Sequence, residues 1–110
     1  MTLQFNGLAE LQQAYPSATI LSDGGVTFVS LPQLQFTVEG EVVTVKGLLC
    51  PQAHSGYTTR LFLERAFPAA DKNWTAHTII NHTWWSWSWN NVQENQPLLA
   101  ILAGHLRAIA

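Results

Sequence analysis

The sequence predicts an α+β domain in which a helix at each end of the chain flanks an antiparallel sheet. Two observations indicate this class. Apolar residues near both ends recur at helical spacing, whereas those between residues 20 and 64 alternate as in strands. A length of 110 residues suits one domain and is too short for two ordinary ones. We therefore expect residues 1–110 to form a single domain with segregated helices and strands.

The first expected element is a short helix over about residues 7 to 15. Asn6 can cap its start, and Pro16 ends it because proline has no N–H to donate to the helical ladder. Its apolar side chains recur at helical spacing and are Leu8, Leu11 and Tyr15. One helix is thus expected before the first strand.

Four strands are expected next, as an antiparallel meander. The first ends near Ile20, and the Asp-Gly-Gly stretch at residues 23–25 predicts a hairpin turn, since such turns need positive φ. The second strand follows this turn and is expected to end at Pro32. Residues 41–50 alternate as a third strand, and residues 57–67 contain the fourth.

The segment after the fourth strand is rich in tryptophan and is expected to be irregular apart from residues 85–90, which alternate as a half-buried strand. Residues 84–89, WWSWSW, hold four of the five tryptophans, and Trp85, Trp87 and Trp89 alternate with polar side chains. Because four exposed indole rings would favour aggregation, we expect most of them to pack between the sheet and the C-terminal helix. The alternative is an aromatic-lined carbohydrate-binding module, which is disfavoured because no carboxylate follows the rings until Glu94.

The last expected element is a helix from about Pro97 to Ile109. Proline suits its first turn, where the missing N–H would have no partner in any case. The buried stripe of this helix comprises Leu98, Ile101, Leu102, Leu106 and Ile109. His105 falls on the same apolar seam, and we interpret it as a hydrogen-bonded core histidine rather than as a metal ligand.

Charge and composition exclude several classes of function. Charged residues make up 11% of the chain, against about 25% in typical domains, and the net charge is −2. No basic patch is present, which argues against nucleic-acid binding.

Neither a signal peptide nor an apolar run of about 20 residues is seen, so we expect no membrane association. No CxxC or HxxxH pattern occurs, so no metal or other cofactor is expected. The single cysteine, Cys50, excludes an internal disulfide and fits a reducing compartment, so a cytoplasmic location is expected.

Three stretches resemble the bacterial ubiquitin-conjugating-enzyme-like (UBC-like) proteins of prokaryotic family E. Residues 24–36 resemble the family's second strand. Residues 43–63 resemble its third strand, the following Pro/Gly/Tyr loop and the fourth strand. Residues 82–109 resemble its Trp-Ser-rich segment and the helix behind it. The resemblance covers about residues 20 to 109. It implies a UBC-like fold with an N-terminal helix, a four-stranded antiparallel meander, a Trp-rich segment and a C-terminal helix.

The resemblance also implies a function. Such proteins act as the carrier in bacterial ubiquitin-like conjugation, in operons that suggest antiviral or stress-related modification. The expected partners are an activating enzyme and a ubiquitin-like protein, whose C-terminus the carrier takes as a thioester and passes to an amine. The sequence departs from conjugating enzymes after the fourth strand: residues 73–85 contain Asn81 and His82 but no His-Pro-Asn stretch and no cysteine. Whether the chain is an enzyme is therefore left open, as is its oligomeric state.

If the chain is a ubiquitin-conjugating-like transferase, Cys50 is the expected nucleophile. An amide such as that of Asn81 would hold the thioester oxyanion. His54 or His82 would act as general base toward the incoming amine. The alternative is a non-catalytic UBC-like adaptor that binds the activating enzyme or the ubiquitin-like protein.

Overall fold

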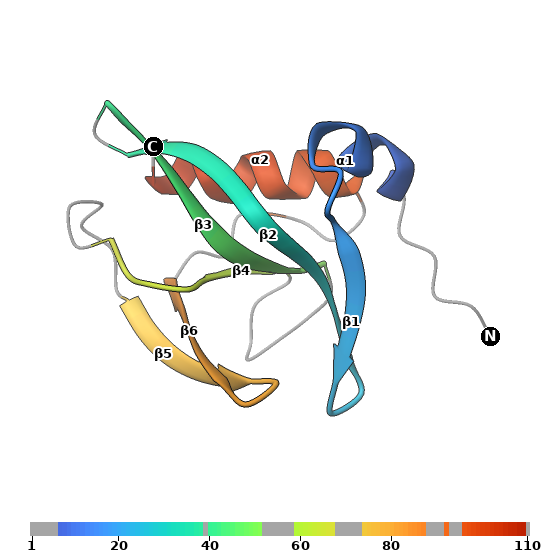
Figure 1. The fold of residues 1–110 in the computed structure, drawn as a ribbon, viewed down its shortest axis with the longest axis vertical. Helices are drawn as coiled ribbons and strands as arrows, with labels where there is room; N and C mark the ends of the chain where they lie inside the picture. Colours follow the sequence, from blue (N-terminus) through green and yellow to red (C-terminus); the bar gives the residue numbers. More distant parts are fainter. Residues whose placement is uncertain are drawn as a thin grey trace.

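One antiparallel sheet and two helices make up the structure, a computed structural model that describes residues 7–38, 40–51, 59–67, 74–87, 92 and 96–109. Among these residues, six strands form the sheet in the order β1-β2-β3-β4-β6-β5 (Figure 1). Along the chain the elements are α1 (Leu8–Ala14), β1 (Thr19–Asp23), β2 (Val26–Val38), β3 (Glu41–Cys50), β4 (Arg60–Leu63), β5 (Trp74–Ile79), β6 (His82–Trp87) and α2 (Leu98–Ile109).

The predicted UBC-like fold with a four-stranded meander is wrong, because the sheet has six strands. The Trp-rich segment, which was expected to hold one strand at residues 85–90 and to be otherwise irregular, forms the hairpin β5–β6 and joins the sheet where β6 pairs with β4. The turn between them has φ of 51° at Ile80 and 62° at Asn81, as a two-residue type I′ turn requires. Neither residue is glycine, so the turn of this hairpin had no recognisable signal in the sequence. The two helices lie where they were expected.

Strand β2 continues through Pro32, where the sequence predicted its end. Its register with β3 shifts between Leu31 and Leu34, and proline is tolerated at such an irregularity because no ladder N–H is needed there. Leu31 and Leu34 are both buried, so the shift keeps the apolar residues on one face of a long strand. The hairpin turn expected at residues 23–25 is confirmed, with positive φ at Gly24 and Gly25.

The two faces of the sheet carry separate apolar clusters, because successive strand side chains point to opposite sides. Helix α2 lies across one face (Figure 1), and the cluster on that side contains Leu11, Val29, Leu31, Leu34, Leu49, Leu61, Leu63, Trp87, Leu98 and Ile101 among others. The smaller cluster on the opposite face comprises Phe28, Leu48, Cys50, Phe62 and Ile79, with Leu21, Val26 and Trp84 packed against it. Trp87 therefore packs as expected, whereas Trp84 faces the other side. Trp89 lies outside the described residues.

Helix α2 is held by the apolar stripe that its spacing predicted. Leu98, Ile101 and Leu102 are buried against the sheet, and each fully buried side chain of this size contributes roughly 1.5–3 kcal/mol. The side chain of Ile109 lies outside the described part of the chain. Neither helix within the described residues has the length and apolar character needed to cross a membrane.

Candidate functional site

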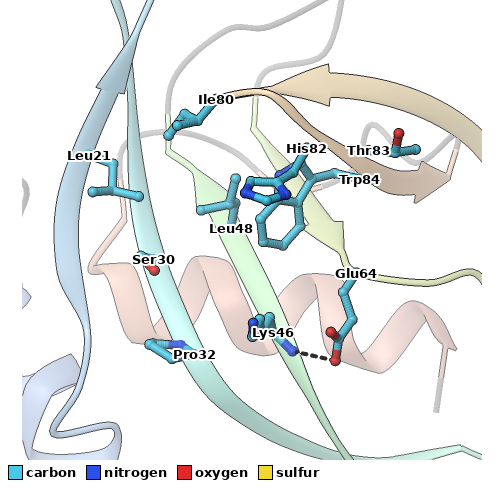
Figure 2. A pocket seen from close by; sticks show the side chains of 10 residues that line it. All are labelled: Leu21, Ser30, Pro32, Lys46, Leu48, Glu64, Ile80, His82, Thr83 and Trp84. Carbon is cyan, nitrogen blue, oxygen red and sulfur yellow. Dashed lines mark hydrogen bonds between the residues drawn. The ribbon is translucent and has the colours of Figure 1, made fainter.

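A pocket of about 310 Å³ lies on the sheet face opposite α2, between the β1–β2 and β5–β6 hairpins (Figure 2). In this view Leu21 lies on the left, Trp84 on the right and Ile80 at the top, and Leu48 of β3 lies between Leu21 and Trp84. The lining residues are Leu21, Ser30, Pro32, Lys46, Leu48, Glu64, Ile80, His82, Thr83 and Trp84. An apolar interior with a few polar groups at this volume is typical of small-ligand sites.

A hydrogen bond between the two hairpin tips closes one end of the pocket. The backbone N–H of Ile80 donates to Oδ2 of Asp23 over 2.8 Å, although the two residues are 57 positions apart. Ile80 has positive φ, which is strained for a β-branched residue. Such strain persists only where the surroundings hold it, and it is concentrated at functional sites. The contact with Asp23 therefore holds the Ile80 side chain at the pocket.

The indole ring of Trp84 is also held in place by contacts within the protein. Its Nε1–H donates to the carbonyl oxygen of Ile79 over 3.2 Å, within the same hairpin. The ring packs against the cluster that contains Leu48 and Phe62. This arrangement gives the pocket a rigid aromatic wall.

Two opposite charges, Lys46 and Glu64, lie at the pocket rim where β3 and the end of β4 run side by side. The backbone N–H of Lys46 donates to Oε1 of Glu64, and the N–H of Glu64 donates to the carbonyl of Lys46, both over 3.0 Å. Both side chains are exposed. The dashed line between these residues in Figure 2 is the hydrogen bond from the Lys46 backbone N–H, and the Lys46 ammonium group forms no ion pair with the Glu64 carboxylate.

The structure places the predicted catalytic residues in different environments. Cys50 ends β3 and is 0% exposed within the cluster beneath the pocket. Asn81 lies in the exposed β5–β6 turn, and the exposed His82 lines the pocket. His54 lies outside the described residues. Cys50 and His82 thus share one face of the sheet, but the thiol is buried while the imidazole is on the rim.

A buried cation lies opposite Cys50 in the sheet. Arg60 pairs with Cys50 across β3 and β4, and its Nε–H donates to the Ser86 hydroxyl over 3.0 Å. Ser86 in turn donates to the carbonyl of Leu61 over 2.7 Å. The guanidinium also lies 5.6 Å from the centre of the Phe62 ring. These contacts fix Arg60 as a link between β4 and β6 and give it a structural role.

His105 is a buried, hydrogen-bonded histidine, as its position on the apolar face of α2 predicted. Thr59 donates its hydroxyl proton to the carbonyl of Val92 over 2.8 Å, so its oxygen accepts the Nε2–H of His105 over 2.9 Å. Burial, with a smaller contribution from the Arg60 charge, lowers the pKa of His105 to about 4. In the described part of the chain, no group of three or more His, Cys, Asp or Glu side chains is placed to hold a metal ion.

The predictions from the sequence did not include this pocket. Its walls come from two hairpins that are distant in sequence and approach only because the sheet curves. The strained turn at Ile80 gives no apolar or glycine pattern to recognise. The one available signal was the alternation of β6, which puts Trp84 on the face opposite Trp87.

Three comparisons with known proteins found no match: no protein-family model, no curated protein and no solved structure is similar to this chain. The resemblance to family E UBC-like proteins therefore stays a prediction from the sequence.

Proposed function

We propose that this chain is a non-catalytic binding domain and that the pocket between the two hairpins is its binding site. The pocket itself carries this proposal: it has an apolar interior, a charged rim and walls held in place by hydrogen bonds from Ile80 and Trp84. Preformed walls reduce the ordering cost of binding, which leaves more of the contact energy as affinity.

Burial of Cys50 favours binding over the carrier function that the resemblance implied. A thioester carrier needs a thiolate that its partner can reach, whereas this sulfur is packed beside Leu48 and Phe62. The expected activating enzyme and ubiquitin-like protein stay predictions, and the adaptor alternative is compatible with this site. A platform of rings for sugars is not favoured, because Trp87 is only 2% exposed and Trp84 faces the opposite side.

Thiol reactivity separates the carrier and binding hypotheses. We expect Ellman's reagent to react with native Cys50 at least roughly a hundredfold more slowly than in guanidinium chloride. An opening cost of about 3 kcal/mol or more would produce this difference. Reaction of the native protein at the rate of the unfolded chain would show an accessible thiol and would favour the carrier hypothesis.

Binding is tested with a small apolar probe, 3-methyl-1-butanol, followed by NMR at the Trp84 indole N–H. We expect a saturable shift of this resonance. Ser30→Leu should abolish the shift, because residue 30 lines the pocket and the larger side chain fills it. Ser22→Leu is the matched control, since Ser22 is exposed on the same hairpin and does not line the pocket. An unchanged Trp84 resonance in the unsubstituted protein would overturn the proposal.

A further inference from the structure

We infer that the pocket binds a zwitterionic small molecule with an apolar side chain, of which a free α-amino acid with a large aliphatic or aromatic group is the simplest. This inference rests on the proposed binding function and adds the chemistry of the ligand. It follows from the presence of one positive and one negative side chain at the rim of an apolar pocket. The positive group is Lys46, the negative group is Glu64, and the apolar lining includes Leu48 and the wall formed by Trp84.

The rim charges are positioned by the backbone rather than by each other. Two hydrogen bonds join Lys46 and Glu64, one from each backbone N–H, so the strands hold the two residues side by side. Oε1 of Glu64 is fixed by the Lys46 N–H, which keeps the carboxylate at the rim. Because the ammonium and the carboxylate form no ion pair with each other, each remains available to an opposite charge on a ligand.

A zwitterion matches this rim better than an ion of one sign. Its carboxylate would face Lys46 and its ammonium would face Glu64, while its side chain would enter between Leu48 and Trp84. A ligand with a carboxylate and no ammonium would leave Glu64 unpaired and would be repelled by it. A ligand with an ammonium and no carboxylate would likewise leave Lys46 unpaired and be repelled by it. Exposed ion pairs contribute up to about 1 kcal/mol, so each rim contact should strengthen binding by up to about fivefold.

The test compares three ligands that share one side chain: L-leucine, N-acetyl-L-leucine without the ammonium, and L-leucinamide without the carboxylate. We expect the protein to bind leucine up to about fivefold more tightly than either analogue, measured by NMR at the Trp84 indole. Glu64→Gln should remove the preference for leucine over N-acetyl-leucine and retain the preference over leucinamide. Lys46→Met should do the reverse. Glu41→Gln, an exposed change on β3 that does not line the pocket, should alter neither preference.

The outcomes separate this inference from the proposed function. Equal affinity for the three ligands, together with binding of 3-methyl-1-butanol, would overturn the zwitterion inference and leave the binding function standing. Tighter binding of either analogue than of leucine would also overturn it, in favour of a singly charged ligand. If neither the alcohol nor leucine shifts the Trp84 resonance, both proposals fail.

Discussion

At the scale of single residues, His105 couples the stability of the fold to pH. Its imidazole is 1% exposed between α2 and the sheet, donates to Thr59, and has a pKa of about 4 in the folded protein against 6.5 for an ordinary histidine. The unfolded chain therefore binds a proton first as the pH falls. The stabilisation from neutral His105 is complete above about pH 6.5 and is lost between that value and about pH 4. The total loss is at most about 3 kcal/mol.

Urea unfolding at pH 7 and at pH 4.5 measures this contribution. We expect the free energy of unfolding to decrease more between pH 7 and pH 4.5 in the unsubstituted protein than in His105→Gln. This comparison holds whatever the stability of the variant at pH 7. His82→Gln, which changes an exposed histidine, is the comparison substitution. The same decline in both the unsubstituted protein and His105→Gln would show that other groups control it.

At the scale of elements, the β5–β6 turn stores conformational strain. A left-handed backbone costs a residue other than glycine or asparagine about 1–2 kcal/mol, and Ile80 adopts it with φ of 51°. Asparagine tolerates this conformation and is favoured in type I′ turns. We therefore expect Ile80→Asn to raise the free energy of unfolding by about 1 kcal/mol, measured by chemical denaturation. Its backbone N–H remains to donate to Asp23.

A second isoleucine provides the control for this substitution. Ile20 on β1 is 42% exposed, close to the 40% of Ile80, but does not have positive φ. Ile20→Asn should therefore not stabilise the protein, because it loses β-propensity without relieving strain. Equal effects of the two substitutions would contradict the strain argument and indicate a general effect of removing an exposed apolar side chain.

The same turn explains which elements the sequence could predict. Helical spacing located both helices, and two glycines after Asp23 located the first hairpin, because these signals are local. The β5–β6 hairpin was missed because isoleucine occupies a position where glycine or asparagine is expected. The extent of β2 was missed because Pro32 normally ends a strand, and the register shift that accommodates it depends on pairing with β3.

At the scale of the whole molecule, the pocket is a consequence of sheet curvature. Strands β1 and β5 are the two edges of the sheet, yet the hairpins that contain them meet at Asp23 and Ile80. Among the residues that the structure describes, no helix covers that face, and the two hairpins shield the apolar side chains between them, including Leu48. This closure is tertiary, and no local pattern encodes it, so sequence reasoning directed attention to Cys50 and His82 instead of to the pocket.

The contact between the hairpin tips should therefore control both local opening and binding. Removing the acceptor in Asp23→Ala frees the Ile80 N–H, and loss of one charge-assisted hydrogen bond of about 1.5 kcal/mol should speed its amide hydrogen exchange roughly tenfold. Affinity for 3-methyl-1-butanol should fall in the same variant, because Ile80 is no longer held over the pocket.

Two variants make this test specific. Asp23→Asn keeps an acceptor oxygen and should show a smaller increase in exchange, whereas Glu10→Ala removes an exposed carboxylate on α1 and should show none. If Asp23→Ala speeds exchange at Ile80 but leaves probe affinity unchanged, the tips are joined for stability alone and the pocket keeps its shape without them. If neither quantity changes, the curvature of the sheet is maintained by the apolar cluster around Phe28 and Ile79 rather than by the contact between the hairpins.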